Sequence, residues 1–338
     1  MNPSTTGLSG PETAPVSVEL LQAMVPSKRF ESEAPVNSLS FHSSGDLLLT
    51  ASSRGQSMQV MSMADGRAQR PLYSKKYGVA HARFTHHRNN IIYASTHEDD
   101  ALRYMSLHDN RYLGYMRGHK GLVTGLEVNP VNDHVLSVSQ DGTLRLWDLR
   151  SPQCQGLIHL ETPKSVCAWD ARGTWFAVGR DDVREVRLFD MRSFDSGPFK
   201  VWGSLHAETG PMSRLLLSPD GQNALVTGEG NAHLLVDAVE GKIKRTLYGH
   251  QSLGPMGSGE DVCFTPDGKF ILGGSATGEI HVWDVEEGRY DGQSSFYLDA
   301  HKSPVHSVAF NPSYAVMATA ASEVALWQPD WRGFNPRQ

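Results

Sequence analysis

Histidine is the residue type with the most potential for chemistry in this chain, which contains fifteen of them. A neutral imidazole can bind zinc or act as a general base, so the spacing of the histidines decides what they could do. The sequence contains no His-x-x-x-His pair and no Cys/His cluster. We therefore interpret the histidines as structural or solvated residues, and we expect no metal site.

The three cysteines lie far apart, at Cys154, Cys167 and Cys263, and form no Cys-x-x-Cys pair. Neither a zinc site nor a disulfide framework fits that spacing. We expect reduced, buried thiols in a cytosolic or nuclear protein.

A catalytic site is equally hard to assemble from the sequence. No serine stands in a Gly-x-Ser-x-Gly turn of the hydrolase type. The glycine-rich stretch 254–259 lacks the Lys-Ser/Thr ending of a phosphate-binding loop, and we interpret it as a flexible connection. We expect no catalytic residues, no cofactor and no enzymatic activity.

The basic pair Lys75-Lys76 is flanked by Tyr73 and Tyr77. One interpretation is a solvated loop whose lysine stems lie along the aromatic rings. The other is a docking point for an acidic or phosphorylated peptide, formed by Lys75, Lys76 and Tyr77. Arg103 and Arg111 would add positive charge if the fold brings them near.

Two further arginines occupy equivalent places, in Trp147-Asp148-Leu149-Arg150 and Phe189-Asp190-Met191-Arg192. This spacing resembles the Trp-Asp-x-Arg feature with which substrate receptors of cullin-type ubiquitin ligases contact their adaptor. The alternative is that Arg150 and Arg192 stabilise surface turns. Both interpretations stay open at this level.

Charge and hydropathy narrow the class of protein. The net charge of −6 argues against a face built for nucleic-acid phosphates, so we expect no direct nucleic-acid binding. The N-terminus has neither the basic start nor the apolar core of a secretory signal. No apolar run approaches the roughly 20 residues of a membrane helix, and we expect a soluble intracellular protein.

The stretch from Gly118 to Arg150 shows which elements position these residues. It opens with Gly-His, passes turns at Asn129-Pro130 and Asp141-Gly142, and closes on Trp-Asp. Such a unit of about 40 residues is the signature of a WD-type propeller blade. Its apolar residue before the first turn recurs at intervals of 41 to 48 residues, at Phe41, Phe84, Val128, Trp169, Leu217, Phe264 and Phe310. The sequence therefore predicts an all-β, seven-bladed WD-repeat β-propeller.

The resemblance to known WD blades implies a structural role for the motif residues of the third repeat. In the WD family, a histidine, a strand serine, an aspartate and a tryptophan form a buried hydrogen-bonded tetrad. The matching residues are His119, Ser137 or Ser139, Asp141 and Trp147, and of the two serines we assign Ser139. The sixth repeat has Thr277-Gly278 in place of Asp-Gly, and we expect its tetrad to be incomplete.

The seventh repeat ends at Trp327 and is one outer strand short, whereas 28–32 is a spare strand ahead of the first repeat. We expect the two to pair and close the ring. The predicted organisation is a disordered tail over 1–17, the propeller over 18–330 and a C-terminal tail over 331–338. Short helical turns are expected near Val18 to Met24.

Four segments resemble one WD-repeat family beyond the blade pattern, namely 73–79, 103–110, 143–157 and 190–199. That family is the WD-repeat subunit shared by the COMPASS histone methyltransferase complex and the nuclear phosphatase or cleavage-and-polyadenylation machinery. The likeness includes the loop 193–198, which propeller geometry does not dictate.

The resemblance implies a nuclear, non-catalytic scaffold that acts in histone H3 lysine-4 methylation and in transcription termination and mRNA 3′-end processing. The implied partners are the N-terminal region of the methyltransferase, other COMPASS subunits, subunits of the cleavage-and-polyadenylation or phosphatase complex, and the phosphorylated C-terminal repeats of RNA polymerase II. A substrate receptor of a cullin-type ubiquitin ligase is the alternative.

Overall fold

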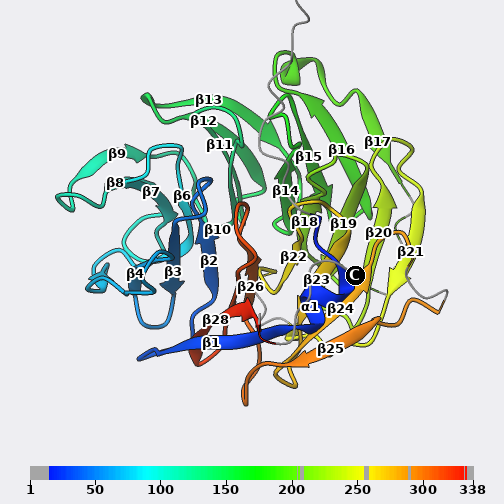
Figure 1. Ribbon diagram of the computed structural model, residues 1–338. Coiled ribbons are helices and arrows are strands. Elements are labelled where there is room, and N and C mark those ends of the chain that lie inside the picture. Colours follow the sequence, from blue (N-terminus) through cyan, green and yellow to red (C-terminus); the bar gives the residue numbers. More distant parts are fainter. Residues whose placement is uncertain are drawn as a thin grey trace, which may run out of the picture.

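The computed structural model describes residues 15–203, 205, 209–254, 259–287, 291–330 and 332. These residues form seven four-stranded antiparallel sheets around a central axis (Figure 1). The prediction of a seven-bladed propeller is therefore confirmed. No helix in the described part of the chain is long and apolar enough to cross a bilayer.

The strands of the first four blades, from the axis outwards, are as follows. Blade 1 has β2 (Ser38–Phe41), β3 (Leu47–Ser52), β4 (Ser57–Ser62) and β5 (Leu72–Tyr73). Blade 2 has β6 (Ala80–Phe84), β7 (Asn90–Ala94), β8 (Leu102–Ser106) and β9 (Tyr112–Met116). Blade 3 has β10 (Val123–Val128), β11 (His134–Ser139), β12 (Thr143–Asp148) and β13 (Ser151–His159). Blade 4 has β14 (Ser165–Trp169), β15 (Trp175–Arg180), β16 (Glu185–Asp190) and β17 (Lys200–Trp202), with the 3₁₀ helix Phe194–Ser196 before its last strand.

The other three blades follow the same order. Blade 5 has β18 (Met212–Leu217), β19 (Asn223–Gly228), β20 (His233–Asp237) and β21 (Ile243–Leu247). Blade 6 has β22 (Val262–Phe264), β23 (Phe270–Gly274), β24 (Glu279–Asp284) and β25 (Phe296–Asp299). Blade 7 has β26 (Ser307–Phe310), β27 (Met317–Ala320), β28 (Glu323–Pro329) and, from the other end of the chain, β1 (Met24–Glu31).

Side-chain burial explains why these segments form sheets. Middle strands such as β7 and β19 are buried along their whole length, because each lies between two neighbouring blades. The apolar clusters accordingly join adjacent blades: Leu188 of blade 4 and Leu215 of blade 5, for example, belong to one cluster. The core is a ring of interfaces between sheets, so each blade depends on its neighbours.

The antiparallel meander gives the disc two faces. One face, the turn face, carries the turns from first to second strand and from third to fourth strand of each blade, such as 42–46 and 149–150. The opposite face, the loop face, carries the connections from one blade to the next, such as 74–79. Every residue in a connection can be assigned to one face from the strand order alone.

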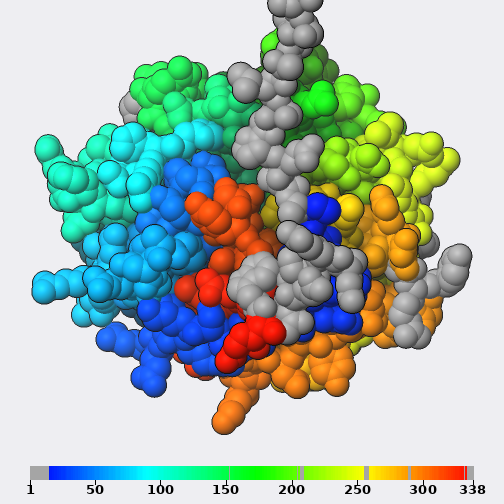
Figure 2. Space-filling view, viewed as in Figure 1, coloured from blue at the N-terminus to red at the C-terminus, as the bar shows by residue number. Residues whose placement is uncertain are grey.

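The N-terminal strand closes the ring. β1 pairs antiparallel with β28 from Met24 opposite Pro329 to Glu31 opposite Glu323. The blue segment that contains β1 and the red segment that contains β28 accordingly lie side by side in Figure 2. The predicted closure is confirmed, although the strand starts at Met24 and is longer than the expected 28–32. Before it, the expected helical turns are present as α1 (Val18–Gln22), with Ser17 accepting a hydrogen bond from the Leu20 N–H as N-cap.

A buried tetrad joins the strands of blade 3. Ser137 Oγ lies 2.7 Å from His119 Nε2 and accepts a hydrogen bond of 2.8 Å from Trp147 Nε1. His119 Nδ1 lies 3.0 Å from an Asp141 carboxylate oxygen. The assignment of Ser139 to the tetrad is wrong, because that residue stands at the strand end, where its Oγ donates to the Gly121 carbonyl and accepts from the Asp141 N–H.

Blade 7 contains a second tetrad, in which a threonine and a glutamate replace the serine and the aspartate of the motif. Thr319 Oγ1 lies 2.8 Å from His301 Nε2 and accepts from Trp327 Nε1 at 2.9 Å. Glu323 stands in for the aspartate, 3.3 Å from His301 Nδ1. The same carboxylate is paired with Arg29 of β1, so the ring-closing strand is tied into this network.

The tetrad of blade 6 is incomplete, as expected. Gly273 of β23 occupies the place of the serine, and a Cβ there would lie 2.7 Å from the Trp283 ring. Trp283 Nε1 donates to the Tyr248 carbonyl at 2.9 Å.

Candidate functional site

The loop that carries Lys75 and Lys76 connects β5 to β6 on the loop face. Its backbone is fixed at both ends: the Ser74 N–H donates to Gln56 O, and the Thr96 N–H donates to Tyr77 O, each at 2.8 Å. Gly78 has φ of +68°, and a Cβ there would lie 1.8 Å from Thr96 Oγ1, so only glycine fits this turn. The loop therefore presents its two exposed lysines from a defined conformation.

Arg103, the second residue of β8, contacts this loop through Tyr77. Its Cζ lies 3.4 Å from the centre of the Tyr77 ring. The guanidinium donates to both carboxylate oxygens of Asp99, at 2.8 and 2.9 Å, and Nε donates to Ser95 Oγ at 2.8 Å. Arg103 is only 1% exposed. The expectation that Arg103 offers its charge to a partner is wrong. Its guanidinium is buried, paired with Asp99 and stacked on the Tyr77 ring.

Two further tyrosines of β9 complete the packing around Arg103. Its Cζ lies 5.7 Å from the Tyr112 ring centre and 5.2 Å from that of Tyr115. A chain of hydroxyl groups runs from Ser74 through Tyr93 to Tyr112, each step 3.1 Å. Burial raises the pKa of the Tyr93 hydroxyl at the centre of this chain.

The two lysines lie over aromatic rings. Lys75 Nζ is 5.4 Å from the centre of the Tyr73 ring, and Lys76 Nζ is 5.0 Å from that of Tyr77. Neither ammonium group forms an ion pair with any residue that the structure describes. We call Tyr73, Lys75, Lys76, Tyr77 and Arg103, with Tyr112 and Tyr115, the cation-aromatic cluster. Chemically it offers two uncompensated positive charges beside apolar ring faces, which suits an anionic peptide.

Tyr112 and Tyr115 were missed from the sequence. They are three residues apart in Tyr-Leu-Gly-Tyr-Met, a spacing that places two side chains on opposite faces of a regular strand. Only the pairing of β9 with β8, which places Arg103 opposite Tyr115, brings them to the loop.

The other three predicted arginines lie on the turn face, away from the lysines. Arg111 stands between β8 and β9, Arg150 between β12 and β13, and Arg192 two residues after the end of β16. The Arg111 side chain is 80% exposed and lies 3.9 Å from Asp109. The predicted partner-binding residues therefore divide between two opposite surfaces and do not form one site.

Arg150 is exposed but is held by its own turn. Its Nε and Nη2 donate to the two carboxylate oxygens of Asp148, at 2.9 and 2.7 Å. These hydrogen bonds lower the pKa of the Asp148 carboxyl to about 2. Arg192 repeats only the backbone part of this arrangement, with its N–H donating to Asp190 at 2.7 Å.

Among the described residues, no group of three or more histidine, cysteine or carboxylate side chains could hold a metal ion.

Comparison with known proteins agrees with this architecture. The model of the WD domain, G-beta repeat, matches residues 24–60, 110–148, 241–284 and 292–323. WD repeat-containing protein 82 of Drosophila melanogaster is 37% identical over 299 residues, which are 88% of this chain and 92% of that protein. COMPASS component SWD2 of Saccharomyces cerevisiae is 35% identical over 88% of this chain and 91% of its own. Set1 complex component swd2 of Schizosaccharomyces pombe is 32% identical over 96% and 95%.

The chain belongs to the WD-repeat protein 82/SWD2 family. Within this family member, the matched repeat segments do not coincide with the blades. Residues 24–60 begin in β1, the outer strand of blade 7, and end in β4, the third strand of blade 1. Each repeat therefore spans two blades and links them covalently.

Proposed function

We propose that this WD-repeat protein 82/SWD2 family member is a non-catalytic scaffold subunit of a nuclear COMPASS-type complex that methylates lysine 4 of histone H3. The observation that carries the proposal is the match over nearly the full length of two relatives named as components of COMPASS and of the Set1 complex. A rigid disc with connections on two faces suits a subunit that holds other chains together.

The proposed direct partners are the N-terminal region of the methyltransferase catalytic subunit and other COMPASS subunits. We extend the proposal to a second assembly, the cleavage-and-polyadenylation or phosphatase machinery, through which the protein would act in transcription termination and mRNA 3′-end processing. The separation of exposed basic residues onto two opposite faces supports two partner surfaces, since one face can be occupied while the other stays open.

Affinity capture of the tagged full-length protein tests the assignment. We expect a Set1-type methyltransferase among the recovered proteins. The alternative is a substrate receptor of a cullin-type ubiquitin ligase, with Arg150 and Arg192 contacting the adaptor. Recovery of a cullin adaptor that disappears in the double variant Arg150→Ala/Arg192→Ala, with no methyltransferase recovered, would overturn our assignment.

For the cation-aromatic cluster we propose binding to the phosphorylated C-terminal repeats of RNA polymerase II. A phosphoserine carries about 1.5 to 2 negative charges near pH 7 and is a strong hydrogen-bond acceptor. Lys75 and Lys76 have no competing carboxylate among their described neighbours, and the tyrosine rings add contact area for a peptide. The buried Arg103 holds Tyr77 in place before any ligand arrives, which lowers the entropic cost of binding.

Fluorescence anisotropy with a labelled phosphorylated repeat peptide tests this site. We expect Lys75→Glu/Lys76→Glu to weaken binding by at least about tenfold, since two charge-assisted hydrogen bonds are replaced by repulsion. The matched control is Lys120→Glu/Lys302→Glu, which changes two exposed lysines that follow the blade histidines on the same face. Equal loss in both double variants would show a non-specific charge effect and would contradict the site.

A further inference from the structure

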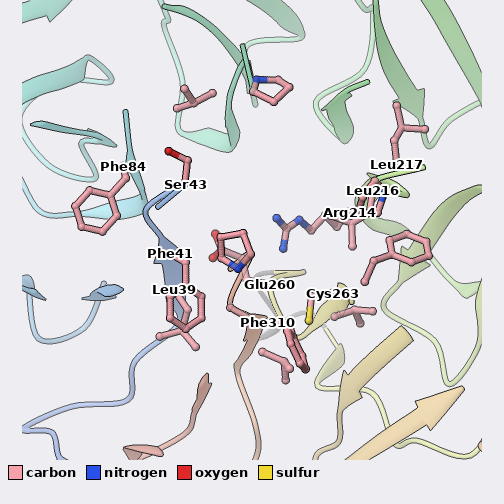
Figure 3. A pocket seen from close by; sticks show the side chains of 18 of the residues that line it. Leu39, Phe41, Ser43, Phe84, Arg214, Leu216, Leu217, Glu260, Cys263 and Phe310 are labelled. Atoms are coloured by element: carbon pink, nitrogen blue, oxygen red, sulfur yellow. The ribbon is translucent and has the colours of Figure 1, made fainter. Parts of the chain in front are cut away.

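The centre of the turn face is hollow. A cavity of about 440 Å³ lies where the first strands of the blades end (Figure 3). Its wall is mainly apolar and is built by the residues that recur before the first turn of six repeats, namely Phe41, Phe84, Val128, Leu217, Phe264 and Phe310. This volume falls within the range of small ligand sites, about 300 to 1,000 Å³.

Two charged side chains lie at the inner end of the cavity. Arg214 and Glu260 line both this cavity and a second, much smaller one of about 20 Å³ deeper in the channel. These two side chains therefore form the floor between the cavities. A ligand that enters from the turn face meets these two charged side chains at the floor.

The two glutamates of the network, Glu260 and Glu127, are paired with its two arginines. Arg83 donates to both carboxylate oxygens of Glu260, at 2.8 and 3.1 Å, and His81 lies 3.3 Å away. Arg83 holds the pKa of Glu260 well below its usual range despite burial. Glu127 lies 3.7 Å from Arg83 and 3.2 Å from Arg214.

Arg214 is the more exposed of the two arginines in this network. Its side chain is 19% exposed and points into the cavity (Figure 3). Of the five N–H donors of a guanidinium, one is used in a hydrogen bond to Glu127 among the described residues. A cation with free donors at the bottom of an apolar cavity selects an anionic acceptor that carries an apolar group close to its charge.

We propose that this cavity binds the C-terminal carboxylate of a partner polypeptide that ends in an apolar residue, with Arg214 donating to the carboxylate. A terminal residue carries its carboxylate and its side chain on one Cα, which places the charge at the floor and the apolar group against the aromatic wall. An internal aspartate or glutamate would require two chain directions to leave through the same opening. The inference goes beyond the proposed function and does not depend on it.

Isothermal titration calorimetry with short peptides tests the site on the purified full-length protein. The probe is an N-acetylated tetrapeptide of three glycines and a C-terminal phenylalanine, and the matched control is the same peptide with a C-terminal amide. We expect the acid to bind at least about tenfold more tightly than the amide, because the amide loses the charge-assisted hydrogen bond.

Two substitutions in the network have opposite expected effects. Arg214→Gln should weaken binding of the acid by about tenfold or more. Glu127→Gln should strengthen it, because Arg214 then loses its internal competitor. A purely structural role of these residues does not predict opposite signs. Phe310→Ala shortens the apolar wall but keeps Arg214, so it should weaken both peptides equally, and it keeps the test usable if Arg214→Gln does not fold.

Three results would overturn the proposal: equal affinity for acid and amide, an unchanged dissociation constant in a folded Arg214→Gln variant, or equally tight binding of hexanoate. The last result would replace the polypeptide by a free carboxylic acid. Thermal melting of each variant establishes that it is folded before titration.

Discussion

Arg103 of blade 2 packs its guanidinium against the ring of Tyr77, which lies in the loop between blades 1 and 2, at 3.4 Å from the ring centre. The contact joins a buried cation that is paired with Asp99 to the residue that follows two exposed lysines. Arg103 is therefore not part of the exposed binding surface; it supports the loop that carries Lys75 and Lys76.

We expect Arg103→Met to impair the loop without removing any exposed charge. The substitution leaves Asp99 and Ser95 without their partner and Tyr77 without its stacking group, so the free energy of unfolding should fall by about 2–4 kcal/mol. Urea unfolding followed by tryptophan fluorescence measures the loss. Phosphopeptide affinity should also fall, and Arg111→Met, at an exposed position, is the control. Full affinity in Arg103→Met would show that the lysines act without the support of Tyr77.

The tetrad of blade 3 predicts unequal roles for two serines on one strand. Ser137→Ala deprives both His119 Nε2 and Trp147 Nε1 of their partner and should cost about 2–4 kcal/mol. Ser139→Ala removes bonds at the strand end and should cost about 1 kcal/mol. Chemical denaturation of the two variants side by side checks the order, and a larger loss for Ser139→Ala would contradict our assignment.

Ring closure predicts that the N-terminal strand stabilises the whole disc. Deleting residues 1–34 removes β1, exposes the edge of β28 and frees Glu323 from Arg29. We expect the melting temperature of the entire protein to fall and its transition to broaden in differential scanning calorimetry. Deleting 1–14 is the control, for which we expect no change. Identical melting of the two truncated proteins would disprove closure as a source of stability.

Stability should fall as the pH is lowered, because buried histidines resist protonation. His250 stacks on His233, with ring centres 4.0 Å apart, and burial lowers its pKa from 6.5 to about 4. Between these values the unfolded chain binds a proton that the folded protein does not, so the free energy of unfolding decreases as the pH falls from 6.5 to 4.

Replacing His250 by phenylalanine should flatten this dependence. The slope should decrease by up to about 1.4 kcal/mol per pH unit, the value for one proton. Urea unfolding at pH 7, 6 and 5 gives the slope, and His108→Phe, at an exposed position, is the matched control. If the free energies of unfolding of His250→Phe and of the wild type fall with the same slope as the pH is lowered, His250 is not the source of the pH dependence.

The amino-acid sequence by itself determined the architecture. An apolar residue before a turn, repeated every 41 to 48 residues from Phe41 to Phe310, is sufficient for seven blades, because each blade is one local meander whose pattern does not depend on distant contacts. The missing outer strand after Trp327 and the surplus strand before Phe41 likewise determined how the ring closes. The blade repeat and the ring closure depend only on the local order of residues and on the number of strands.

Only the tertiary structure decided which side chains take part in each polar network. Ser137 and Ser139 point to the same side of their strand, and the stagger of three strands selects Ser137 as the partner of Trp147. Arg103 and Arg111 are both arginines of blade 2, yet one is buried by residues from another loop and the other is exposed. Arg214 reaches the central cavity because blades far apart in the sequence meet there. Burial and charge pairing depend on such long-range contacts, which no local pattern in the sequence records.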